Sequence, residues 1–115
     1  EEGSASGLGL ISGTVRRLPD TSDHGPMKIP HMGWSVVDSM GDHPLLSNLP
    51  SDSRFYFVHS YAAVPSDENC VIGTSVHGVS FVSAVACQTV MGVQFHPEKS
   101  HRYGKALLAN FAGGV

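Results

Sequence analysis

Apolar positions in the first half of the chain recur in short alternating runs, which are typical of strands rather than helices. The clearest run covers residues 54–64, where aromatic and β-branched residues predict one continuous strand. Looser alternation predicts two further strands, over residues 8–18 and 28–38. Between them, residues 19–26 are rich in Asp, Ser, Gly and Pro and predict a surface loop, whereas residues 1–7 show no period and are expected to be mobile.

The second half of the chain predicts two hairpins. Residues 71–76 and 79–85 are apolar runs separated by a His-Gly pair, a glycine-containing turn of two residues. The second of these runs meets a third, residues 90–95, across a Gln-Thr pair. We therefore expect three consecutive antiparallel strands in this part of the chain.

Helical signals are confined to two places. Residues 42–50 can form one helical turn, with Asp42 as N-cap and Pro44 in the first turn. Residues 100–111 predict a longer helix with Ser100 as N-cap, because apolar residues repeat at the spacing of one helix face. This stripe consists of Tyr103, Leu107, Leu108 and Phe111. Taken alone, strands followed by one terminal helix suggest an α+β half-domain.

The predicted strand over residues 90–95 ends at a histidine and a carboxylate on either side of a proline. Pro97 favours an extended backbone at His96, so the side chains of His96 and Glu98 can point to the same side. Glu98 could then accept from one ring nitrogen of His96, which leaves the other nitrogen to take a proton from a nucleophile. These residues alone fit either a general base with its orienting carboxylate or, more commonly, an exposed pair in a loop.

Length and composition restrict the class of protein. The chain has 115 residues, of which 41% are hydrophobic and 15% charged, values that fit at most one globular domain. The net charge of -3 comes from scattered residues, so neither a nucleic acid nor an anionic membrane surface is expected as a partner. No apolar run approaches the ~20 residues that cross a bilayer.

Cysteine and histidine usage suggests no metal or redox site. Cys70 and Cys87 lie in different local settings, so we expect two inert free thiols in a cytoplasmic protein, or a plastid protein if the source is a plant. His96, Glu98 and His101 lie close together and could supply two histidines and a carboxylate to zinc. However, no His-x-x-x-His pair occurs on a predicted helix, and neither a metal nor another cofactor is expected.

Three stretches together resemble a known family. Residues 92–98 read Gly-Val-Gln-Phe-His-Pro-Glu, which resembles the triad motif of the class I (Cys-His-Glu) glutamine amidotransferases. Residues 28–34, Lys-Ile-Pro-His-Met-Gly-Trp, and residues 55–61, Phe-Tyr-Phe-Val-His-Ser-Tyr, narrow the resemblance to the glutaminase subunit or domain of imidazole glycerol phosphate synthase. The resemblance implies an α/β three-layer sandwich, of which this chain is a C-terminal, strand-rich part with one C-terminal helix.

The resemblance implies an activity for the intact protein. It would hydrolyse glutamine to glutamate and ammonia through a cysteine thioester, without a cofactor, in histidine biosynthesis. The ammonia would pass to a (β/α)8 cyclase, which is either a separate subunit or a fused domain. His96 would be the general base and Glu98 its orienting carboxylate. The main chain around Ser60 and Tyr61 would hold the α-amino and carboxylate groups of glutamine.

The resemblance also implies a face that meets the cyclase. Its residues would be His31, Met32, Gly33, Trp34, Tyr56 and Lys99. An apolar aromatic surface suits this position, because ammonia must cross without being protonated or lost to bulk water. Lys99 would form an ion pair across the interface. Ser35 replaces the asparagine that usually follows this tryptophan in the family, which puts one interface hydrogen bond in question.

The nucleophile of the family is not found in these residues. It is a cysteine on a glycine-rich turn, and neither Cys70 nor Cys87 lies in a Gly-x-Cys-x-Gly pattern. We therefore expect residues 1–115 to be the C-terminal portion of one amidotransferase domain that lacks its N-terminal half, and to be inactive alone. The alternatives are a non-catalytic module that docks on a cyclase or amidotransferase partner, and the glutaminase of another synthase, for anthranilate, carbamoyl phosphate or guanylate.

Overall fold

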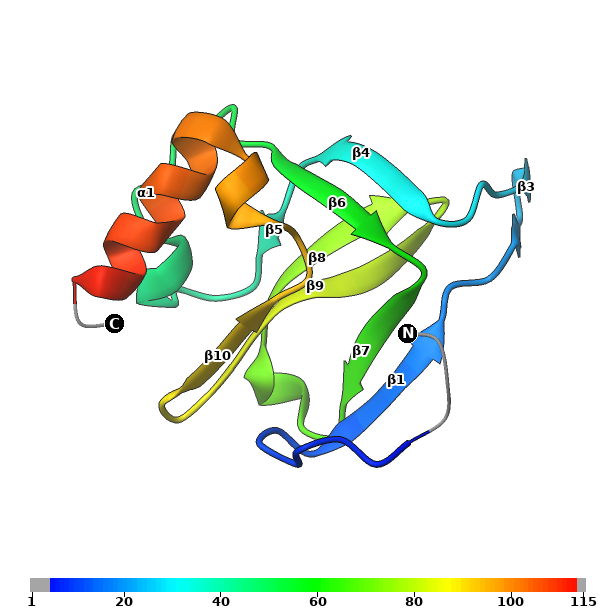
Figure 1. Ribbon diagram of the computed structural model, residues 1–115, viewed down its shortest axis with the longest axis horizontal. Helices are drawn as coiled ribbons and strands as arrows, with labels where there is room; N and C mark the ends of the chain where they lie inside the picture. The colour runs from blue at the N-terminus through cyan, green and yellow to red at the C-terminus, as the bar shows by residue number, and fades with distance from the viewer. Residues whose placement is uncertain (1–4, 114–115) are drawn as a thin grey trace.

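The computed structural model of the chain describes residues 5–113 (Figure 1). The first residues of the segment that we expected to be mobile, 1–4, lie outside this range, and residues 5–12 belong to no helix or strand. Within the described range, no helix combines the length and the apolar character that crossing a membrane requires.

Six strands form one sheet. They are β1 (Gly13–Arg17), β5 (Asp38–Ser39), β7 (Tyr61–Pro65), β8 (Val71–His77), β9 (Val79–Cys87) and β10 (Val90–Val93). Their order is β1-β7-β9-β8-β5, and β10 pairs with the end of β9. All of these pairings are antiparallel. The two hairpins that the sequence predicted are therefore confirmed, as is the strand-rich character of the chain with one C-terminal helix.

Two smaller ladders complete the strands. One pairs β4 (His31–Ser35) with β6 (Phe55–His59), and the other pairs the short strands β2 (Thr21–Ser22) and β3 (Gly25–Pro26). The latter pair lies within the segment that we predicted as a loop. In Figure 1, β3 and the helix α1 (His101–Ala112) lie at opposite ends of the longest axis.

The prediction of one continuous strand over residues 54–64 is wrong. The chain forms β6 and β7 instead, and these have different partners: β6 pairs with β4, whereas β7 pairs with β1 and β9. The physical reason is a change of phase in the burial pattern. Phe55, Phe57 and His59 are buried, but the next buried residue is Ala62, three positions later instead of two. The break lies at Ser60, whose carbonyl accepts a hydrogen bond from the main chain of Leu18 at 2.8 Å.

The core lies where the sheet, the β4–β6 ladder and α1 meet. Phe55 and Phe57 of β6 pack against Phe95, with ring centroids 4.2 and 5.5 Å apart, and Phe57 also contacts Phe81 of β9. Leu107 is the buried apolar residue of α1. Burying each of these side chains contributes roughly 1.5–3 kcal/mol of transfer free energy. The aromatic cluster therefore fixes the segment around residue 95 against β6.

The helical predictions need two corrections. The turn over 42–50 is the short 3-10 helix η1 (Pro44–Leu46), and its N-cap is His43 rather than Asp42, because the His43 ring accepts from the main chain of Leu45 at 3.1 Å. In α1, Leu107 is buried, but Leu108 and Phe111 are 49% and 55% exposed. The predicted apolar stripe is therefore wider than the face that α1 buries.

The expectation of two free thiols is wrong. Cys70 and Cys87 form a disulfide with their Cα atoms 5.1 Å apart. The reason is the register of the β8–β9 hairpin, in which Val71 lies opposite Val85. This register brings the residue just before β8, at the end of the short helix η2 (Glu68–Cys70), beside the last residue of β9. Local sequence around each cysteine carries no information about that proximity.

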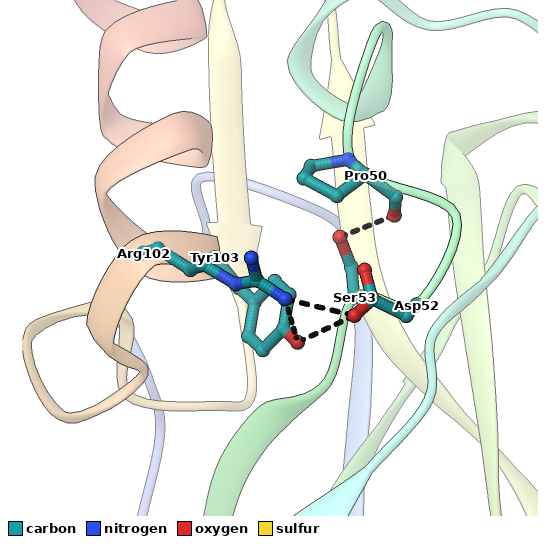
Figure 2. A network of polar contacts seen from close by, with 5 residues as sticks. All are labelled: Pro50, Asp52, Ser53, Arg102 and Tyr103. Carbon is teal, nitrogen blue, oxygen red and sulfur yellow. Dashed lines mark hydrogen bonds and ion pairs between the residues drawn. The ribbon is translucent and has the colours of Figure 1, made fainter.

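A polar network fastens the first turn of α1 to the loop before β6 (Figure 2). Arg102 donates to the Asp52 carboxylate at 2.8 Å and to the Tyr103 hydroxyl at 3.0 Å, and that hydroxyl donates to Asp52 at 3.1 Å. In the same loop the Ser53 hydroxyl donates to the Pro50 carbonyl at 2.6 Å. The network lies at the surface, so it orients α1 rather than adding much stability.

Candidate active site

The segment after β10 carries His96 from the sheet to the β4–β6 ladder. The main chain of Gln94 still donates to Ser83 of β9 at 2.9 Å, whereas that of His96 donates to the Tyr56 carbonyl of β6, also at 2.9 Å. The backbone at His96 is extended, with φ -102° and ψ 96°, as expected for a residue that precedes proline. The segment that contains His96 is therefore held by main-chain hydrogen bonds to β9 at Gln94 and to β6 at His96 itself.

The carboxylate of Glu98 lies beside the His96 ring. Residues Pro97–Lys99 form one turn of 3-10 helix, η3, which folds the chain back so that Glu98 Oε1 is 2.8 Å from His96 Nδ1. Since a carboxylate can only accept, Nδ1 carries the hydrogen, and Nε2 is the basic nitrogen of the neutral ring. The contact predicted between these two residues is thus present. Their catalytic roles stay predictions.

The pair lies at the surface, where solvent reaches both side chains. The side chain of His96 is 35% exposed and that of Glu98 is 61% exposed. The main-chain N–H of Glu98 and the His96 ring both donate to the Glu98 carboxylate and lower its pKa. Glu98 is therefore a charged acceptor throughout the neutral range.

Ser100 positions the loop that contains the pair. It is fully buried; its hydroxyl donates to the His96 carbonyl at 2.7 Å and accepts from the Tyr56 main chain at 3.0 Å. The sequence predicted it only as the N-cap of α1, and its side chain makes no capping hydrogen bond. Sequence reasoning missed this role because Tyr56 is 44 residues away along the chain.

Gly104 allows α1 to pack directly on η3. A Cβ built at this position would overlap the Pro97 carbonyl, a main-chain group that has little freedom to move. The first turn of α1 and the His96-containing loop therefore fit together only with glycine at 104.

Ser60 and Tyr61 lie at the junction of β6 and β7, both half-buried. The Ser60 carbonyl accepts from Leu18, and the Tyr61 carbonyl accepts from His59 Nδ1 at 2.8 Å. The main chain that the resemblance assigns to glutamine binding is therefore fixed by hydrogen bonds to two other residues.

Most of the residues that we assigned to a partner face form one exposed group. Met32 and Trp34 of β4 are 62% and 42% exposed, and the Tyr56 ring packs edge-on against Trp34 with centroids 5.8 Å apart. Gly33 lies between the two β4 residues, and Lys99 is exposed on the adjacent η3. His31 is the exception: it is 4% exposed, and its ring lies beneath this surface.

His101 joins this face, although the sequence had suggested it only as a possible metal ligand. Its ring stacks on Trp34, with centroids 5.6 Å apart and 12° between the planes. Within residues 5–113, no group of three or more His, Cys, Asp or Glu side chains is arranged to hold a metal ion. We define the docking face as Met32, Trp34, Tyr56, Lys99 and His101.

Comparisons with known proteins point to one family. The family model for glutamine amidotransferase class-I matches residues 7–114. Imidazole glycerol phosphate synthase subunit HisH from Methylococcus capsulatus is 51% identical in an alignment 115 positions long, which covers 96% of this chain and 53% of that protein. The HisH proteins of Nitrosospira multiformis and Aromatoleum aromaticum are 48% and 46% identical, each over 96% of this chain and 54% of the relative. The chain thus spans about half the length of these curated relatives.

A solved structure shares the fold. The crystal structure of a Thermoplasma acidophilum protein described as a GMP synthase subunit superposes with a TM-score of 0.65 at 22% identity, over 88% of this chain and 47% of that one. At this identity the likeness concerns the fold alone. The match of the family model over nearly the whole chain, together with the HisH relatives, shows that the chain belongs to the class I glutamine amidotransferase family.

Proposed function

We propose that this chain supplies the general base and its orienting carboxylate to the glutaminase of imidazole glycerol phosphate synthase. The enzyme hydrolyses glutamine to glutamate and ammonia. The observation that carries the proposal is the 2.8 Å contact between His96 Nδ1 and Glu98, at a surface position held by Ser100 and β6. The HisH relatives, at 46–51% identity, support this particular synthase over those for other products.

In the proposed reaction, His96 Nε2 takes the proton of a cysteine thiol. The thiolate attacks the side-chain carbonyl carbon of glutamine, and the carbonyl electron pair moves onto oxygen. When this intermediate collapses, the C–N bond breaks and the protonated His96 gives its proton to the leaving nitrogen, which departs as ammonia. Water, deprotonated by His96, then attacks the thioester and releases glutamate and the thiol. Glu98 holds the ring in the required tautomer through both steps.

The nucleophile of this reaction would come from outside the 115 residues. Cys70 and Cys87 are joined in a disulfide, and neither is flanked by the glycines of a nucleophile turn. The relatives are almost twice as long as this chain, so their length leaves room for a cysteine-bearing portion of the same domain. Active enzyme therefore requires that portion together with this one.

The docking face would bind the cyclase that receives the ammonia. Its aromatic side chains are exposed beside the loop that contains His96, so ammonia released there would enter an interface poor in water. Lys99 is exposed at the edge of this face and would pair with a carboxylate of the cyclase. The same exposed face also supports the second candidate, a module that docks on a cyclase without chemistry of its own.

Glutamate release from glutamine by the intact protein with its cyclase tests the proposal. We expect activity in the parent protein and its loss in His96→Ala. The matched control is His24→Ala, because the His24 side chain is exposed in the turn between β2 and β3. If the parent protein binds a cyclase but releases no glutamate, the docking module is the correct function and the glutaminase proposal fails.

A further inference from the structure

Three histidines gather beneath the docking face. His31 and His59 are 4% and 2% exposed, and His77 of β8 is half-buried. The His31 ring stacks between Phe57 and His77, with centroids 5.0 and 4.3 Å away, and Phe81 packs against its edge. None of these histidines takes part in the proposed reaction, yet burying imidazole rings costs free energy unless their nitrogens are hydrogen-bonded.

Two of these rings form a continuous chain of hydrogen bonds. The Ser35 hydroxyl lies 3.0 Å from His31 Nε2, and His31 Nδ1 lies 3.0 Å from His59 Nε2. His59 Nδ1 in turn lies 2.8 Å from the Tyr61 carbonyl oxygen. We call Ser35, His31, His59 and the Tyr61 carbonyl the histidine relay. It leads from β4, the strand of the docking face, to the main chain at the start of β7.

The groups at the two ends of the relay determine which nitrogen donates and which accepts in each of its hydrogen bonds. A carbonyl oxygen only accepts, so His59 Nδ1 must carry its hydrogen, and in a neutral ring Nε2 is then the acceptor. His31 Nδ1 must therefore carry a hydrogen to donate to His59 Nε2, which leaves His31 Nε2 to accept from the Ser35 hydroxyl. Both rings are thus held as the Nδ1–H tautomer.

The surroundings keep His31 neutral. Burial, and secondarily the nearby His77 and His59 rings, lower the pKa of His31 to about 4. Protonating both relay rings would set an N–H of His31 against an N–H of His59 across 3.0 Å, so the relay tolerates at most one extra proton. The His77 ring is outside the relay, because its Nε2 contacts the Lys28 carbonyl.

We propose that His59, held by His31, is a positioning residue that fixes the Ser60–Tyr61 main chain in the orientation that binds the α-amino and carboxylate groups of glutamine. This inference rests on the proposed function and on the glutamine-binding role that the resemblance assigns to the Ser60–Tyr61 main chain. The argument is geometric: the Ser60 carbonyl is engaged by Leu18, and the Tyr61 carbonyl by His59, so both consecutive peptide units have a set direction. Removing the His59 ring removes the hydrogen bond to the Tyr61 carbonyl, at the junction where β6 changes to β7, and leaves this peptide unit to its pairing in the β1–β7 ladder.

Steady-state kinetics of the intact protein with its cyclase give the first test. His59→Leu is expected to raise KM for glutamine about fivefold to tenfold, the range for a lost hydrogen bond, with kcat changed less than twofold. In His59→Asn, a side-chain amide can still donate to the Tyr61 carbonyl, and KM should return to within about twofold of the parent. His77→Phe is the matched control, since it keeps the stack on His31 and leaves the relay intact.

Imidazole nitrogen NMR on the parent protein gives a second test that needs no activity. The Nδ1 of both His31 and His59 should be protonated at neutral pH, with Nε2 unprotonated. An Nε2–H tautomer in either ring would overturn the relay.

Each kinetic outcome bears on a different claim. An unchanged KM in a folded His59→Leu variant would overturn the positioning role while leaving the glutaminase proposal in place. A parent protein that does not hydrolyse glutamine would overturn the proposed function and this inference together.

Discussion

Two histidine sites in this chain use the same side chain for opposite purposes. His96 lies at the surface with a carboxylate on Nδ1, and its other nitrogen is available for proton transfer. His31 and His59 lie in the core with both ring nitrogens hydrogen-bonded inside the protein. His96 faces a charged and exposed carboxylate, whereas burial among aromatic rings opposes a proton on His31. The environment, rather than the residue type, separates the proposed base from the positioning residues.

The pH dependence of stability gives the largest expected effect on the free energy of unfolding, and it sharpens this contrast. Because the pKa of His31 falls from 6.5 to about 4 on folding, the unfolded chain binds more protons between these pH values. The free energy of unfolding should therefore fall as pH decreases through this window, by about 3 kcal/mol from His31. We expect the free energy of unfolding, measured by denaturant titration and plotted against pH, to fall less steeply across this window in His31→Phe than in the parent protein. Equal slopes would show that His31 is not held neutral.

Gly104→Ala should disturb the exposed site at His96 and Glu98, and leave the buried site at His31 and His59 intact. The added methyl group meets the Pro97 carbonyl, so η3 must shift away from α1. Overpacking of this kind costs about 2 kcal/mol, and glutamine turnover should fall because η3 contains Glu98. Gly7→Ala, where a Cβ meets nothing within 4 Å, is the control for thermal unfolding and activity. A Gly104→Ala protein with parental stability and turnover would contradict the close packing.

Glu98→Gln should weaken the exposed site without changing its shape. An amide can still contact the His96 ring, but it lacks the charge that stabilises the protonated imidazole. We expect kcat for glutamine to fall about tenfold to a hundredfold, with KM nearly unchanged. Glu68→Gln, at an exposed position in η2, controls for loss of one negative charge. Parental kcat in Glu98→Gln would remove this carboxylate from the mechanism.

Arg102→Ala should have the smallest effect. Arg102 and Asp52 are 68% and 57% exposed, and ion pairs between solvated side chains contribute little to stability. Denaturant titration at physiological salt should not separate this variant from the parent. A clear loss of stability would mean that the network in Figure 2 fixes α1, and through it η3, more strongly than its exposure suggests.

The exposed site could be predicted from sequence because its contact is local. His96 and Glu98 are two residues apart, and the conformational limits that Pro97 imposes on its neighbour are known from chemistry alone. The hairpins were equally accessible, since each joins neighbouring runs across a two-residue turn. The split between β6 and β7 was not accessible, because residues 55–58 and 61–64 are both continuous apolar and aromatic runs, and the change of phase appears only in which of them are buried.

The buried site could not be predicted in this way. His31 and His59 are 28 residues apart, and the contact of Ser100 with Tyr56 spans 44. The first depends on the register of β4 with β6, which pairs His31 directly with His59, and the second on the packing of the His96 loop against β6. The disulfide between Cys70 and Cys87 likewise depends on the register of β8 with β9. Long-range register is set by packing of the whole core, which no local motif encodes.

The most direct test of the two-site account is the separation of kcat from KM for glutamine in two variants of the intact protein with its cyclase. His96→Ala should lower kcat by at least about 10³-fold, because the base acts in the transition state. His59→Leu should raise KM with kcat nearly unchanged, because the relay acts on substrate binding. If both substitutions lower kcat to a similar extent, or if His96→Ala retains parental kcat, the division between a reacting and a positioning histidine site is wrong.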